Sequence, residues 1–220
     1  MKKFVALLAV AALSVSLAAC GGQQASNEPA PAEQTATEQP AEQPAEQPAE
    51  QAAEQISLAD WEGTWDDMSL WLDLPEIQEA YKTKADKDGK TPEEVKEGLV
   101  QRRRCDFHGM VIEGNKISFL DNWAAKDGKE TQAVEYEFVK QHLIEGDGRT
   151  TEWDEFKAVT EGAAYPVLVM MPVHGEETMT HFHLRYGDNA EALINMEEKW
   201  YPTFVKPTTT VEQMIAEIAE

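Results

Sequence analysis

Two histidines separated by one residue, His181 and His183, are the strongest candidates for metal chemistry in this chain of 220 residues. They lie in an alternating apolar run, residues 180–187, which predicts a β-strand. In a strand, residues two apart project from the same face about 6.6 Å from each other, so two neutral imidazoles can share one ion through bonds of roughly 2 Å. The pattern indicates a metal site; the alternative is an ordinary pair of strand histidines that bind nothing.

The segments before this pair predict an antiparallel meander that would position it. Short alternating runs are separated by turn residues such as Gly114-Asn115 and His174-Gly175. The predicted strands cover residues 107–112, 116–120, 134–139, 153–159, 167–171 and 180–186. We therefore expect the fold class α+β, mainly antiparallel β, built as a barrel or strongly curved sheet with flanking helices.

Helix signals flank the meander on both sides. Thr91 is followed by Pro92 and by Glu94, which together form a capping box at the start of a helix. A second capping pair, Thr209 with Glu212, is predicted to start the last helix. Besides the helix that starts after Thr91, the predicted helices cover residues 70–81, 190–199 and 211–219.

The N-terminus carries an export signal. Lys2 and Lys3 precede an apolar stretch over residues 4–19 that is too short to span a bilayer comfortably but has the length of a signal peptide. The run Leu17-Ala18-Ala19-Cys20 resembles the bacterial lipobox, in which the cysteine is lipidated and becomes the first mature residue. We therefore predict a signal peptide over residues 1–19 and a lipid anchor at Cys20 that holds the protein to a membrane.

A tether and a single domain follow. Residues 20–55 begin at Cys20 and continue in Ala, Glu, Gln and Pro, with seven Glu and no Lys or Arg. Such a segment has no aromatic side chains with which to form a core, so it predicts a disordered acidic spacer. Residues 56–220 are long enough for one domain with one core.

The charge balance excludes nucleic acid as an expected partner. The chain has 19 Lys and Arg against 41 Asp and Glu, a net charge of −22, whereas phosphate binding needs clustered cations. The one basic cluster, Arg102-Arg103-Arg104, predicts a solvated strand end. Apart from Cys20 the chain has only Cys105, so no intramolecular disulfide can form in the domain, and Cys105 is predicted to be a buried, inert thiol.

Several motifs together resemble those of the ZinT family, bacterial zinc-binding proteins with a lipocalin-like domain. Gly63-x-Trp65 resembles the lipocalin opening signature, and His181-Phe182-His183 is followed by a short helix and then by Trp200-Tyr201-Pro202-Thr203-Phe204. The resemblance covers nearly all of residues 58–219. It implies a lipocalin-like, calycin-like barrel and an extracytoplasmic protein that captures Zn²⁺ and delivers it to the solute-binding protein of a zinc importer.

The same resemblance implies a three-histidine site for zinc, with Cd²⁺ and other divalent transition metals as alternatives. Two ligands carry over to His181 and His183. The third comes from the preceding strand in the family, and its nearest counterpart is His174, which lies two residues closer to the pair than the family spacing. Pro172 and Gly175 predict a rearranged turn that brings His174 to the site.

Two other function classes stay open on the sequence alone. A zinc hydrolase would need a Glu beside the open metal position as general base, but the chain has no His-Glu-x-x-His motif, so we expect no enzyme. A lipocalin-like carrier or surface interaction module without a metal is the other alternative. His108 and His142 have no partner at chelating spacing and are predicted to be structural or exposed, and Glu176 and Glu177 to be solvated.

Overall fold

The computed structural model describes residues 56–220 except 147 and 177. Within this part, eight antiparallel strands follow one another around a closed barrel in chain order, and β8 pairs with β1 to close it. This arrangement confirms the predicted meander and the lipocalin-like barrel. The strands are β1 Gly63–Asp67, β2 Gly109–Glu113, β3 Lys116–Leu120, β4 Glu130–Gly146, β5 Arg149–Ala158, β6 Val167–Met170, β7 His181–Gly187 and β8 Thr203–Val205.

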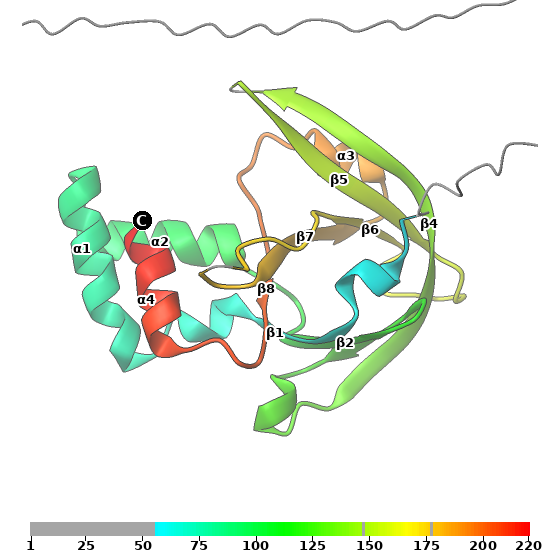
Figure 1. The fold of residues 1–220 in the computed structure, drawn as a ribbon, viewed down its shortest axis with the longest axis horizontal. Helices are drawn as coiled ribbons and strands as arrows, with labels where there is room; N and C mark the ends of the chain where they lie inside the picture. The colour runs from blue at the N-terminus through cyan, green and yellow to red at the C-terminus, as the bar shows by residue number, and fades with distance from the viewer. Residues whose placement is uncertain (1–55, 147, 177) are drawn as a thin grey trace, which may run out of the picture. The chain divides into compact units, whose positions relative to one another are not determined.

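Helices flank this barrel, as expected. In Figure 1, α1, α2 and α4 gather on one side of the barrel, while α3 lies near the upper part of β5 and contacts β6 and β7. The predicted signal peptide, Cys20 and the tether lie outside the described residues. The helices are α1 Gln78–Asp88, α2 Pro92–Arg103, α3 Ala190–Ile194 and α4 Val211–Ala219, with short 3-10 turns η1 Leu58–Trp61, η2 Met68–Trp71, η3 Pro75–Ile77 and η4 Ala124–Lys126.

The capping signals locate two of the helices well. Thr91 accepts a hydrogen bond from the backbone of Glu94, and Glu94 returns one to Thr91, so α2 begins as predicted. The last helix has the predicted range, but its capping box is formed by Thr210 and Gln213, one residue later than the predicted Thr209 pair.

Two predicted helices differ from the structure. The stretch 70–81 divides into two 3-10 turns before α1 begins, because Pro75 starts a turn of its own. Helix α3 stops at Ile194 rather than at residue 199, since Arg185 takes up backbone carbonyl oxygens that a longer helix would need, those of Leu193 and Ile194, at 2.6 and 3.3 Å.

Aromatic side chains fill the barrel interior. Trp65 and Phe182 meet edge to face at 4.7 Å, and Phe107 stacks on Phe204 at 5.3 Å. A second core lies between the barrel wall and the helices, where Val205 of β8 packs with Met214 and other buried residues of the helical layer. The outward face of β7 and β8 is therefore covered by protein, and polar groups on it lie in a partly dry environment.

Candidate metal centre

The two histidines of the His-x-His run lie on the outward face of β7. Phe182 and Leu184 point into the aromatic core of the barrel and are fully buried, whereas His181 and His183 alternate with them and face the helical layer. Their ring centroids are 5.2 Å apart. This is the same-face arrangement that the spacing predicts.

His174 reaches the same face through a tight hairpin. Its backbone exchanges two hydrogen bonds of 2.9 Å with His181, so the two residues lie directly opposite each other. Gly175 follows with a φ of +75°, and a Cβ there would lie 2.4 Å from the backbone oxygen of Met179. Only glycine suits this turn, which compensates for the shortened spacing between His174 and the pair.

The three histidines form a compact group. The ring centroid of His174 is 4.1 Å from that of His181 and 5.2 Å from that of His183. One ligand atom from each residue lies within 4.8 Å of the others, and this is the one such group of three or more metal-ligating side chains among the described residues. The structure therefore brings together the three residues proposed from the sequence.

Hydrogen bonds select the nitrogen that each ring presents to this group. The Nδ1 atoms of His174 and His181 lie 2.8 Å from the backbone oxygens of Pro172 and Met179. A carbonyl oxygen only accepts, so each Nδ1 carries a proton, and in the neutral ring Nε2 is then the nitrogen with the free lone pair. Carbonyl partners of this kind orient metal-binding histidines and fix their tautomer.

His183 is held in the same tautomer by a hydroxyl group. Its Nδ1 lies 2.9 Å from Oγ1 of Thr203, and that hydroxyl donates its single proton to the backbone oxygen of Tyr201. Thr203 can therefore only accept from His183, which leaves Nε2 of His183 unprotonated. All three imidazoles thus offer Nε2 as a ligand atom.

The surroundings keep two of these rings neutral. Burial, together with the neighbouring charge of Arg103, lowers the pKa of His183 to about 2. Burial lowers the pKa of His181 as well. A metal ligand must be deprotonated, so both rings are ready to bind an ion without first losing a proton.

Arg103 contradicts the prediction that the three arginines form a solvated strand end. It is the last residue of helix α2 and is 92 % buried, because its side chain extends under the outward face of β7 and β8. Its Nη1 donates to the backbone oxygen of Tyr201 at 3.1 Å and to Oγ1 of Thr203 at 2.6 Å. Nη1 is also 3.4 Å from Nδ1 of His183. No local sequence pattern distinguishes this arginine from its two neighbours.

A pocket of about 660 Å³ opens beside the group and is lined by His174 and His183. No carboxylate of the described residues joins the three histidines as a ligand. Glu176 is exposed, as expected, and Glu177 lies outside the described residues. Three imidazoles with a position left open toward a pocket fit zinc, which is typically held by three protein ligands where the ion must exchange or react.

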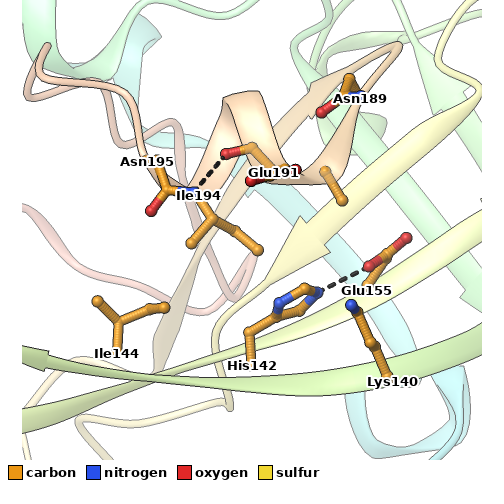
Figure 2. A pocket seen from close by; sticks show the side chains of 9 residues that line it. Lys140, His142, Ile144, Glu155, Asn189, Glu191, Ile194 and Asn195 are labelled. Carbon is orange, nitrogen blue, oxygen red and sulfur yellow. Dashed lines mark hydrogen bonds and ion pairs between the residues drawn. The ribbon is translucent and has the colours of Figure 1, made fainter.

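The remaining candidate residues have structural partners. His142 on β4 lies 2.7 Å from the carboxylate of Glu155 on β5, in a second pocket that faces α3 (Figure 2). His108 pairs with the buried carboxylate of Asp67 at 2.8 Å. Cys105 is half-buried rather than fully buried as predicted. Burial nevertheless raises the pKa of its thiol well above its ordinary value, which suits the inert role predicted for it.

A family model described as ZinT (YodA) periplasmic lipocalin-like zinc-recruitment matches residues 46–220. The chain belongs to the ZinT family. This membership confirms the resemblance drawn from the sequence and agrees with zinc as the expected metal. In the described part of the chain, no helix combines the length and apolar character needed to cross a bilayer.

The sequence of one relative agrees with this membership. The chain is 26 % identical over 165 residues to a probable metal-binding protein, YrpE, of Bacillus subtilis, a match that covers 72 % of this chain and 64 % of that protein. The chain thus spans less than two thirds of that relative's length.

Two crystal structures from Streptococcus pneumoniae share the fold. The Zn(II)-bound ZinT-like domain of AdcA matches with a TM-score of 0.59 at 20 % identity, over 77 % of this chain and 93 % of that domain. Zn(II)-bound AdcA matches with a TM-score of 0.60 at 19 % identity, over 74 % of this chain and 35 % of the longer protein.

Proposed function

We propose that this protein binds one Zn²⁺ through Nε2 of His174, His181 and His183 and serves to capture the ion outside the cytoplasm. The observation that carries the proposal is the convergence of three imidazoles whose Nδ1 atoms all lie within hydrogen-bonding distance of oxygen acceptors. Membership in a zinc-recruitment family supports the same conclusion. Zinc is the cargo in this account, and no catalytic role is assigned to it.

We further propose that the captured ion is passed to the solute-binding protein of a zinc importer. Three protein ligands leave zinc a position at which an incoming group can begin the exchange. The relatives offer a precedent in outline, since AdcA of Streptococcus pneumoniae contains a ZinT-like domain within a longer zinc-bound chain.

The export signal and the lipobox-like run that ends at Cys20 support a lipid anchor on the outer side of a bacterial membrane. The acidic spacer over residues 20–55 would then give the zinc-binding domain reach from the membrane surface. The periplasmic description of the family agrees with a location outside the cytoplasm.

Two alternative functions are less well supported. A carrier of apolar molecules needs space inside the barrel, yet large side chains such as Trp65, Phe156 and Phe182 fill this interior and are almost completely buried. A zinc hydrolase needs a carboxylate poised at the open metal position, and no described carboxylate joins the histidine group.

Substitution of His174 tests the proposed ligand set most sharply, because its spacing departs from the family. His174→Ala should weaken zinc binding by at least about tenfold, as expected for loss of one of three ligands. Isothermal titration of the metal-free domain with zinc measures the change. His142→Ala is the matched control, since it also removes a half-buried histidine but at the Glu155 pair away from the site. Unchanged affinity in His174→Ala would exclude this residue from the site.

Lipid anchoring is tested at the other end of the chain. Cys20→Ser should move the protein from the membrane fraction to the soluble extracytoplasmic fraction while zinc binding stays at the wild-type level, because the histidine group lies wholly within residues 56–220. Immunoblots of fractionated cells measure the distribution. A variant that still sediments with membranes would contradict the anchor.

A further inference from the structure

The pocket beside the histidine group has a basic wall, which is unexpected next to a cation site in a chain of net charge −22. One acidic side chain, Glu152, lines the pocket. The basic residues that line it are Arg102, Arg103, Arg149 and Lys199. Three of these four residues are exposed, while Arg103 is buried beside His183.

Arg103 holds a buried positive charge without an acidic partner. Nη1 is used by Thr203 and Tyr201, Nε has no hydrogen-bond partner, and Nη2 makes no hydrogen bond to any residue that the structure describes. Glu217 of α4 is near enough to raise the pKa of Arg103 but forms no ion pair with it within the described chain. The adjacent Arg104, by contrast, pairs with Glu198 at 3.1 Å.

A divalent ion bound to three neutral imidazoles would add two positive charges close to this arginine. The bound ion and the guanidinium of Arg103 would repel each other, and the repulsion is strong where water is largely excluded. The repulsion is relieved if an anion binds between them, because it is attracted by both the ion and the guanidinium. Nη2 of Arg103 has no hydrogen-bond partner among residues 56–220 as described, and arginine suits carboxylates in particular because its fork matches their two oxygens.

We propose that the basic pocket binds a carboxylate that completes the coordination of the metal, with one oxygen on the ion and the other held by Arg103. Arg102, Arg149 and Lys199 at the wall would attract the anion and screen its charge. The inference rests on the proposed zinc function and adds a second ligand class to the same site. The carboxylate belongs either to a small free anion or to an acidic side chain of a protein that approaches the pocket.

Co²⁺ in place of Zn²⁺ provides a direct test, because its visible absorption bands respond to a change of ligand. Zn²⁺ has a filled d shell and therefore has no such bands. Titration of the Co²⁺-loaded wild-type protein with sodium acetate should shift these bands saturably, and sodium chloride at equal concentration should not reproduce the shift. Bands that do not respond to acetate in a Co²⁺-loaded protein would overturn the inference.

Three variants locate the binding group. Arg103→Gln should raise the acetate concentration for half-saturation about tenfold, as expected for the loss of one charge-assisted hydrogen bond. Because this residue is buried and its loss can disturb the fold, the exposed pair Arg102→Gln with Lys199→Gln gives an independent test, with an expected loss of about threefold. Arg104→Gln is the control and should leave acetate binding unchanged. Equal losses in the control and in the pocket variants would overturn the assignment.

A second titrant distinguishes the two sources of the carboxylate, a small free anion and an acidic side chain of a protein. A short oligoglutamate peptide, compared with acetate at the same carboxylate concentration, should bind more tightly if the natural ligand is an acidic side chain of a protein, and no more tightly if it is a small free anion. Failure of this inference is distinct from failure of the proposed function: a protein that binds no Co²⁺ or Zn²⁺ contradicts the function, whereas metal binding without a response to acetate contradicts the carboxylate alone.

Discussion

The two faces of the seven-residue strand β7 have different roles, and successive residues alternate between them. The inward face places Phe182 against Trp65 and Phe204 in a dry aromatic core. The outward face carries His181 and His183, whose hydrogen bonds go to oxygen atoms of neighbouring segments. The inward face stabilises the barrel, and the barrel in turn fixes the position of the histidines on the outward face.

This contrast separates the residues that hold the fold together from those that are placed to bind a metal. Inward residues interlock with many neighbours, so their size and shape are constrained. Outward residues depend on a few partners, and one of these, His174, comes from a hairpin that precedes the strand. We therefore expect substitutions on the two faces to separate stability from metal binding.

The largest effect should come from the inward face. Phe182→Ala should lower the free energy of unfolding by about 3–5 kcal/mol, because it opens a cavity in the aromatic core. Urea unfolding with and without zinc measures this loss, and the increment that zinc adds should survive in the variant. Phe182→Leu, which keeps most of the volume, should cost less. Loss of the zinc increment together with stability would mean that the two faces are coupled.

A smaller effect should appear on the outward face when the pH is lowered without metal. His181 and His183 have pKa values below their ordinary 6.5 in the folded protein. Above pH 6.5 neither the folded nor the unfolded state binds protons at these rings. Below pH 6.5 the unfolded chain binds protons at these rings and the folded domain does not, so His183 alone should lower the stability by about 1.4 kcal/mol by pH 5.5, and His181 should add to this fall.

A double His181→Gln, His183→Gln variant is the comparison for that measurement. Thermal unfolding at several pH values in the presence of a chelator should show a flatter decline than in the wild type. His108 should act with the opposite sign, because its hydrogen bond to Asp67 raises its pKa. The stability that it adds is present below pH 6.5 and is lost as the pH rises through the raised value. A double variant whose stability declines between pH 7.5 and pH 5.5 as steeply as that of the wild type would contradict the neutral histidines.

Local patterns predicted much of the fold. Alternation located the six strands from β2 to β7, and the Thr91 capping box located α2. The strands β1 and β8 were not among the predicted ranges, and the three residues of β8 are too few to show a period. The cap of α4 was placed one residue early, because adjacent threonines offer the same side chain.

The site was predictable only in its local part. The pairing of His181 with His183 follows from strand geometry, but the approach of His174 depends on a glycine turn with positive φ. Arg103 was misread, because its burial depends on where the end of α2 meets the barrel. Contacts between elements far apart in the sequence leave no periodic signal in either one.

Zinc titration of the double variant His181→Ala, His183→Ala tests the central claim most directly. The wild-type domain should bind one zinc, seen as a single step by isothermal titration and a single adduct by native mass spectrometry, and zinc at a hundred times its dissociation constant should add about 2.7 kcal/mol of stability. The double variant should lose both the binding step and most of that stabilisation while its circular dichroism stays that of a barrel. A folded double variant that binds one zinc as tightly as the wild type would show that the metal site lies elsewhere.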